Sequence, residues 1–359
     1  MWYETSLTRL LGIQYPLILA PMAGGPTTPE LVAAVSNAGG LGSLGAAYLA
    51  PAALRAAIHA IRERTDRPFN VNLFAPLPEE TPPAAVARAQ ARLDAYRAEL
   101  GIPASAAPTG PFAPAFAEAL AALVEERVPV VSFTFGLLPA DAMRQIKESG
   151  AVVLGTATTV AEGVALAASG VDGVVAQGSE AGGHRGTFLG DMDAALIGTL
   201  ALVPQLADAV RVPVVAAGGI MDGRGLVAAL ALGAAGAQMG TAFLTCPESG
   251  AHPQHKAALL AATDDATRLT RAFSGRTARA LRNRFVEEMR GHEDDIAPYP
   301  AQNVLTRDIR QAAARQDQPE FLSLWSGQAP RLARTLPAAE LVRAVVEEAE
   351  RVIARLSSR

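Results

Sequence analysis

The stretch 214–242, VVAAGGIMDGRGLVAALALGAAGAQMGTA, decides the fold. It opens with a short β-branched run at 214–217 and closes with a second strand-like run at 237–240. Between these runs, residues 223–232 have the apolar spacing of a helix. The first run is apolar throughout, as expected of a strand that is buried on both faces of a parallel sheet. The stretch therefore predicts a strand–helix–strand unit of a parallel α/β fold.

The same unit recurs from residue 17 to residue 240. Apolar or β-branched runs predict strands at 17–20, 41–44, 69–72, 130–133, 152–155, 173–176, 214–217 and 237–240. Helix-like stretches lie between them, at 29–38, 51–64, 139–149, 159–168, 194–209 and 223–232. This alternation predicts a closed (β/α)8 barrel, the TIM barrel. The alternative is an open, doubly wound sheet, but PMAGGP at 21–26, after the first strand, lacks its glycine fingerprint.

Two segments interrupt the alternation. Residues 76–114 are rich in proline around a charged, helix-like stretch at 84–100, and residues 247–325 carry helix-like pieces. They follow the third and eighth strands, so both emerge on the face of the barrel where active sites lie. We predict that 1–75 and 115–246 form the barrel, that the two segments form a smaller, mainly helical cap that binds substrate, and that 326–359 add a C-terminal helix on the barrel. Surface insertions without a role are the alternative.

The composition excludes several classes of protein. The 31 basic and 35 acidic residues, a net charge of −4, form no basic stripe for nucleic acid. No run of about 18 apolar residues predicts a membrane span, and residues 1–11 do not resemble a signal peptide. One cysteine, Cys246, permits no intrachain disulfide and fits a reducing compartment. We therefore expect a cytoplasmic monomer or homodimer that acts on a small molecule.

Glycines follow the seventh and eighth predicted strands. Gly218 and Gly219 come after the seventh, and Gly240 and Thr241 come after the eighth. Without a Cβ, backbone N–H groups approach a phosphate closely, and barrels of this type often bind phosphate in these two loops. Either pair alone is an ordinary turn signal. Together, one βα unit apart, they predict a phosphate site.

The loop after the sixth strand reads QGSEAGGHRG, from Gln177 to Gly186. His184 lies between glycines that would let its imidazole reach over a planar ligand. Near neutral pH an imidazole moves a proton or holds a positive charge against an anion. We predict that His184 is catalytic; the alternative is a solvent-exposed loop histidine.

In combination, these motifs resemble the nitronate monooxygenase family, formerly called 2-nitropropane dioxygenase, and its class I branch. The likeness includes LAPMAGG at the first strand, FNVNLF at the third, and QGSEAGGHRG, PVVAAGGI and AQMGTAFL further on. It continues through YPAQN near Tyr299 and LWSGQ near Trp325. The resemblance therefore covers nearly the whole chain.

The resemblance implies that FMN lies across the strand ends. Pro21 and Met22 would line the isoalloxazine, and Asn72 and Gln177 would hydrogen-bond to its polar edge. The remaining cofactor contacts would come from Gly182, Gly183, Gly218, Gly219, Gln238, Gly240, Thr241 and Gln302.

On the substrate side, His184 matches the family's catalytic histidine. Ala23, Tyr299 and Asn303 would line the substrate pocket, which in this family is often richer in tyrosine. Several of these residues also have structural alternatives. Asn72 would cap a turn, Gln177 would satisfy buried backbone groups, Met22 would fill the core, and Tyr299 would simply pack.

The implied reaction starts with one electron passing from a nitronate to FMN. Oxygen then reacts, and the products are a carbonyl compound and nitrite. With a neutral nitroalkane, His184 would first act as general base. Propionate 3-nitronate is the family's typical physiological substrate, which implies a role in detoxification.

Other functions remain as alternatives. An FMN- and NADH-dependent reductase of enoyl-acyl carrier protein or quinones shares the glycine sites, and a non-catalytic flavin-binding protein is more remote. An inosine-monophosphate-dehydrogenase-like activity needs a cysteine nucleophile after the sixth strand, where this chain has none. We predict no metal site, because His252 and His255 have no carboxylate at ligand spacing.

Overall fold

Eight parallel strands form a closed barrel in the computed structural model, which describes residues 1–76, 81–103, 108, 112 and 115–358. The strands are β1 (Leu17–Leu19), β2 (Gly42–Gly45), β3 (Phe69–Phe74), β4 (Val130–Thr134), β5 (Val152–Ala157), β6 (Gly173–Gln177), β8 (Val214–Ala217) and β9 (Gly236–Met239). Their order is β1-β9-β8-β6-β5-β4-β3-β2. A bridge between Ile18 and Leu41 closes the ring. The predicted (β/α)8 barrel is confirmed.

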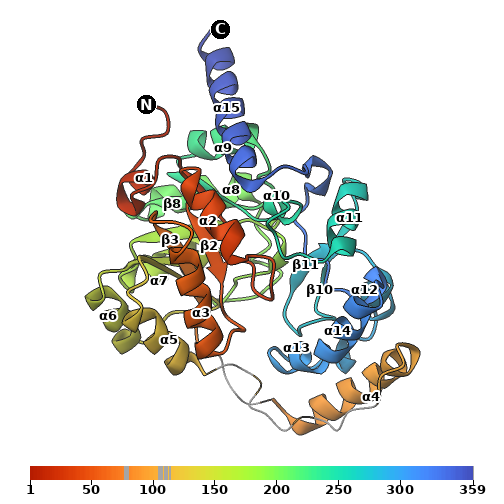
Figure 1. Ribbon diagram of the computed structural model, residues 1–359. Helices are drawn as coiled ribbons and strands as arrows, with labels where there is room; N and C mark the ends of the chain where they lie inside the picture. Colours follow the sequence, from red (N-terminus) through yellow and green to blue (C-terminus); the bar gives the residue numbers. More distant parts are fainter. Residues whose placement is uncertain (77–80, 104–107, 109–111, 113–114, 359) are drawn as a thin grey trace.

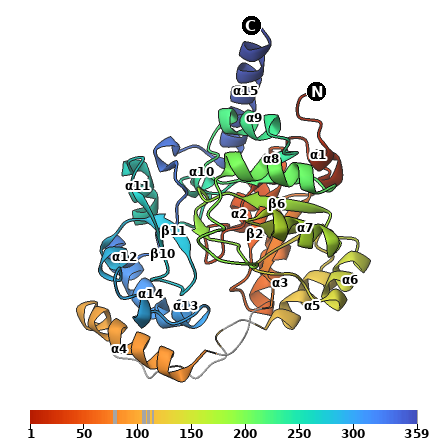
Figure 2. The ribbon, with the colours of Figure 1, turned by 180° about the vertical axis from the view of Figure 1, so that it is seen from behind.

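Helices surround this barrel (Figures 1 and 2). They are α2 (Pro29–Asn37), α3 (Pro51–Arg62), α5 (Phe116–Glu125), α6 (Ala140–Glu148), α7 (Val160–Ala168), α8 (Thr199–Ala209), α9 (Gly223–Ala231) and the short α10 (Thr241–Leu244). Pro29 and Pro51 occupy first helical positions, where their fixed φ and missing N–H cost nothing. The helix expected from residue 194 begins only at Thr199, because Gly198 is its N-cap.

The barrel interior changes character along its axis. At the N-terminal end, α1 (Ser6–Leu11) inserts Leu7 and Leu11 into a cluster with inward-facing residues such as Val175 and Val215. Toward the C-terminal ends the inward side chains become polar. Asn72 donates to the Ser132 hydroxyl at 2.9 Å. One end of the barrel is therefore sealed with apolar side chains, and the other offers hydrogen-bonding groups to a ligand.

A cap covers the C-terminal end of the barrel. Its elements are α4 (Pro83–Glu99), α11 (Pro253–Ala261), α12 (Arg284–Glu288), α13 (Ala301–Leu305), α14 (Arg307–Arg315), the 3-10 helices η1 (Glu293–Asp295) and η2 (Pro319–Phe321), and the strands β10 (Thr267–Thr270) and β11 (Ala278–Leu281). The orange α4 lies beside the blue C-terminal helices in both views (Figures 1 and 2). In the insertion predicted over 76–114, positions 77–80, 104–107, 109–111, 113 and 114 lie outside the described residues.

The cap also contains a sheet that the prediction of a mainly helical cap did not include. Strands β10, β11 and β7 (Gly183–His184) form it in that order, and all pairs are antiparallel. Strand β7 belongs to the loop after β6, so the sheet joins the cap to the barrel. The loop that carries His184 is thereby held by both parts of the molecule.

The C-terminal segment returns to the barrel. After η3 (Pro330–Leu332), α15 (Ala338–Ser357) packs against α9 and α2, and its last turns extend beyond them (Figure 1). A Cβ on Gly223 would lie 2.3 Å from the Ala349 nitrogen, so only glycine allows this helix crossing. Within the described residues, no helix is long and apolar enough to cross a membrane.

Candidate active site

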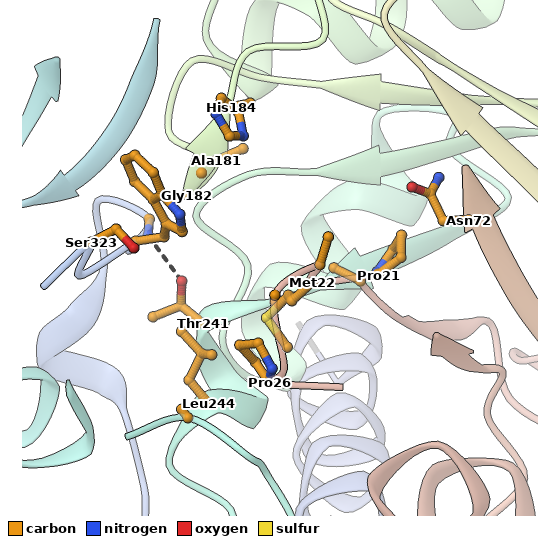
Figure 3. Close-up of a pocket in the computed structure, with 18 of the residues that line it drawn as sticks. Pro21, Met22, Pro26, Asn72, Ala181, Gly182, His184, Thr241, Leu244 and Ser323 are labelled. Atoms are coloured by element: carbon orange, nitrogen blue, oxygen red, sulfur yellow. Dashed lines mark hydrogen bonds between the residues drawn. The ribbon is translucent and has the colours of Figure 1, made fainter. Parts of the chain in front are cut away.

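A cavity of about 680 Å³ lies between the C-terminal ends of the barrel strands and the cap. The barrel side includes Met22 and Asn72, and the cap side includes Asn303, Arg310 and Trp325. Met22, Asn72, Gly182, His184 and Thr241 border the same space although they come from distant parts of the chain (Figure 3). Its volume falls within the range of small-molecule and cofactor sites.

Most residues predicted for the site line this cavity. They are Pro21, Met22, Ala23, Asn72, Gln177, Gly182, Gly183, His184, Gly218, Gly219, Gln238, Gly240, Thr241 and Asn303. Tyr299 stands behind them, with its ring 5.7 Å from the His184 ring, centroid to centroid. The structure thus brings together segments from five strand ends and the cap.

Gln302 does not reach the cavity. Its side chain is fully buried, its Nε2 donates to the Ala272 carbonyl at 2.8 Å, and its Oε1 accepts from the Ala297 N–H. Consecutive residues of a helix point in different directions, so Asn303 faces the cavity while Gln302 braces the cap. A contact between Gln302 and a phosphate is therefore inconsistent with its position.

His184 is placed by the sheet that links barrel and cap. In the β7–β11 pair, His184 lies opposite Ala278, and its Nε2 is 2.8 Å from the Ser274 hydroxyl. That hydroxyl is also 3.1 Å from the Arg276 carbonyl, which can only accept. Both contacts are satisfied when Ser274 donates to the carbonyl and the His184 Nε2–H donates to Ser274. The other ring nitrogen, Nδ1, then carries the lone pair.

The electrostatic surroundings keep His184 neutral. Burial, followed by repulsion from Arg276 and Arg310, lowers its pKa to about 3. An imidazole with so low a pKa is uncharged at neutral pH. His184 is therefore a hydrogen-bonding group, and the positive charge expected of it comes from the two arginines, which stay protonated with pKa values of about 10.

Aromatic rings enclose His184. Phe135, Tyr299 and Trp325 lie 5.8, 5.7 and 5.3 Å from its ring, centroid to centroid. Phe135 has φ of +82°, which is strained for any residue but glycine, and the Arg276 guanidinium stacks 4.0 Å above its ring. The sequence prediction missed Phe135, although its position directly after β4 is where barrel active sites are built.

Away from His184, the cavity is lined by Gly218, Gly219, Gly240 and Thr241, which we call the glycine cradle. Gly218 and Gly219 have φ of +126° and +69°. In the described part of the chain, the N–H groups of Gly219 and Thr241 have no hydrogen-bond acceptor, so they are free to bind a phosphate. The Thr241 hydroxyl accepts the Gly327 N–H at 2.9 Å, which ties the LWSGQ segment to the strand end at Thr241.

Asn72 and Gln177 differ in the freedom of their amides. Asn72 donates to Ser132, and its oxygen has no partner among the described residues. The Gln177 Oε1 accepts from the Gly186 N–H at 2.8 Å and from Arg185 at 3.2 Å, and its Nε2 donates to the His184 carbonyl. Gln177 therefore holds the loop that carries His184. The second N–H of the Gln177 amide has no acceptor among the described residues, so it can bind a ligand.

Two arginines on α14 line the cap side, and the sequence prediction missed both. Arg307 is exposed at the cavity rim, whereas Arg310 donates to the backbone and side chain of Asn303. The nearby Asp308 pairs with Arg97 instead. Among the described residues, no carboxylate forms an ion pair with Arg307 or Arg310. This side of the cavity therefore attracts anions.

The comparisons with known proteins agree with one another. A family model described as nitronate monooxygenase matches residues 4–348. A probable nitronate monooxygenase of Staphylococcus haemolyticus is 46% identical over 355 residues, which cover 98% of this chain and 99% of that protein. The solved structure of nitroalkane oxidase from Streptomyces ansochromogenes has a TM-score of 0.89 at 42% identity, with 98% and 100% of the two chains covered. FabK from Thermotoga maritima has a TM-score of 0.78 at 31% identity, with 99% of each covered.

Proposed function

The chain belongs to the nitronate monooxygenase family, whose members are flavin-dependent oxidoreductases, and we propose that it binds FMN and oxidises alkyl nitronates with O2 to a carbonyl compound and nitrite. The observation that carries this proposal is one cavity with a glycine cradle at one end and a neutral histidine among arginines at the other. We further propose propionate 3-nitronate as the substrate, and detoxification in the cytoplasm as the role.

The cavity fits a flavin mononucleotide in shape and chemistry. The free N–H groups of Gly219 and Thr241 would bind the phosphate, and a Cβ at Gly240 would meet Ala20 at 3.3 Å and narrow the cradle. Pro21 and Met22 would line the ring system, and Asn72 and Gln177 would face its polar edge. A bound flavin supplies the electron acceptor for nitronate oxidation, while the protein supplies binding and orientation.

The state of His184 favours nitronates over neutral nitroalkanes. A nitronate has already lost its proton, so the enzyme needs to attract and orient an anion, which Arg276 and Arg310 do electrostatically. A neutral nitroalkane requires a base, and Nδ1 of His184 is the candidate. Because its low pKa makes the imidazole a weak base, we expect faster turnover of preformed nitronates.

The arginines of α14 support a substrate that carries a second negative charge. Arg307 and Arg310 are free of carboxylate partners within the described residues and line the cap side of the cavity. A guanidinium matches the geometry of a carboxylate. Propionate 3-nitronate has such a carboxylate, whereas ethyl nitronate does not.

The test is a steady-state assay of the FMN-loaded enzyme. Oxygen uptake and nitrite release are measured with propionate 3-nitronate, ethyl nitronate and nitroethane, and NADH oxidation is measured separately. We expect oxygen uptake together with nitrite release, fastest with propionate 3-nitronate. Rapid NADH oxidation without nitrite release from any nitronate would favour the reductase alternative. If the protein did not bind FMN, the result would argue against both the nitronate-oxidising and the NADH-dependent activity.

A further inference from the structure

Arg185 is an unusual buried cation beside the active site. Its side chain is fully buried, and it donates to the carbonyls of Gly178 and Ala195 and to the side-chain oxygen of Gln177. In the described part of the chain it has no ion-pair partner, and its Nε–H has no acceptor. Isolated buried charges are costly, so such a group calls for a function.

The buried Arg97 of the cap provides a contrast. It is 2% exposed, and its guanidinium pairs with Asp308 at 2.7 Å and with Asp94 at 2.9 Å. Its charge is therefore neutralised by contact and ties α4 to α14. Among the residues that the structure describes, no carboxylate contacts Arg185, and carbonyl oxygens solvate it instead.

Other charges act on Arg185 from a distance. Glu162 and Glu180 raise its pKa, while burial, the largest effect, and Arg279 lower it to about 10. Both carboxylates are engaged elsewhere: Glu162 accepts from Thr158, and Glu180 accepts from Thr199. Arg185 thus stays protonated at neutral pH.

Arg185, together with the Gly186 N–H, fixes which way the Gln177 amide points. The guanidinium and the Gly186 N–H can only donate, so the amide atom that faces both must be the oxygen. The NH2 group then lies on the opposite branch, where one N–H reaches the His184 carbonyl. Gln177 lines the cavity, so its amide offers a ligand a hydrogen-bond donor. Arg185, on the far side of this amide, polarises it.

We propose that Arg185 is a positioning residue that acts through Gln177: it holds an N–H donor and a fixed positive charge beside the cavity, and so favours the reduced, negatively charged state of the bound flavin. This inference rests on the proposed binding of FMN. It also explains why a cation occupies a site where a neutral side chain would cost less to bury.

The experiment measures the midpoint potential of bound FMN by equilibration with a redox dye. Wild type is compared with Arg185→Met, Arg185→Lys, Gln177→Glu and, as a buried-arginine control, Arg97→Met. In Gln177→Glu the side chain keeps its shape and still accepts from Arg185 and the Gly186 N–H, but its charge cancels that of Arg185 and it loses the donor, including the bond to the His184 carbonyl. FMN affinity and melting temperature are measured on every variant.

We expect Arg185→Met and Gln177→Glu to shift the ratio of reduced to oxidised flavin at least tenfold toward the oxidised form, a potential about 30 mV more negative for a two-electron couple. Arg185→Lys should keep a potential near wild type, and Arg97→Met should lower only the melting temperature. Unchanged potentials in variants that bind FMN would overturn the inference. If Arg185→Met does not fold, Arg185→Gln decides, because it removes the charge while keeping N–H donors for the Gln177 oxygen. A wild type that binds no FMN would instead refute the proposed function.

Discussion

The barrel side and the cap side of the cavity use different chemistry. On the barrel side the contacts are backbone N–H groups, glycines, the amides of Asn72 and Gln177 and the rings of Phe74 and Phe135, while the cation Arg185 lies behind the wall. On the cap side they are Arg307, Arg310 and Trp325. Backbone groups on parallel strands form a rigid, uncharged cradle that suits a cofactor. Long charged side chains on short helices suit the selection of an anionic substrate, so we expect mutations on the two sides to separate cofactor binding from substrate choice.

The largest effect is expected at Gly182, where the barrel loop meets the C-terminal segment. A Cβ there would lie 2.5 Å from the Gly327 nitrogen, and backbone cannot yield as a flexible side chain does. Overpacking of this kind costs about 1–3 kcal/mol, so Gly182→Ala should weaken FMN binding roughly 5- to 150-fold. Gly136→Ala, whose Cβ meets only Ala75 at 3.4 Å, is the matched control. Equal FMN affinities in the two variants would contradict this packing argument.

His184→Asn tests the histidine whose loop is attached to both the barrel and the cap. Asparagine keeps a hydrogen-bonding group but has no imidazole base, so FMN should stay bound while kcat with nitroethane falls at least about tenfold. Turnover of ethyl nitronate, which needs no base, should fall less. Unchanged activity on nitroethane would show that His184 is not the base.

Arg307→Met tests the cap side alone. Loss of a charge-assisted hydrogen bond costs about 1.5–3 kcal/mol, so KM for propionate 3-nitronate should rise roughly tenfold or more. KM for ethyl nitronate, which lacks the carboxylate, should hardly change. Arg315, also exposed on α14 but outside the cavity lining, supplies the control Arg315→Met. A parallel rise for both substrates would argue against a carboxylate site.

The smallest effect is expected for the pH dependence of kcat/KM with a preformed nitronate. Because burial lowers the pKa of His184 from 6.5 to about 3, the imidazole loses its proton far below neutrality and stays neutral from pH 5 to 8. The kcat/KM of preformed nitronate should therefore show no histidine step in that range. The His184→Asn profile should have the same shape. A step near pH 6.5 that disappears in His184→Asn would mean that the histidine is charged when it works.

The barrel could be predicted from the sequence because its signals are local. Apolar runs define the strands, and glycines such as Gly218 mark strand ends that line the cavity. The sheet of the cap could not be predicted, since TRLT and ARAL show no strand-like alternation, and ARAL also pairs with Gly183 and His184, which are distant in sequence. Long-range pairing of this kind depends on tertiary context.

The side-chain roles were harder to predict than the elements. Nothing local distinguishes Gln302, which braces the cap, from Asn303, which faces the cavity, because both lie on α13 and the choice depends on how that helix is packed. The commitment of the Gln177 amide to Arg185 and the loop backbone is likewise visible only in three dimensions. The neutral state of His184 depends on Arg276 and Arg310, which arrive from other parts of the chain.

We propose that a single cavity holds a flavin against the barrel and a nitronate against the cap. The most direct test mixes the FMN-loaded enzyme, without oxygen, with one equivalent of propionate 3-nitronate or of NADH, and follows the flavin absorbance. We predict rapid loss of the oxidised-flavin band with the nitronate and not with NADH. Bleaching by NADH alone, with the nitronate inert, would contradict the account.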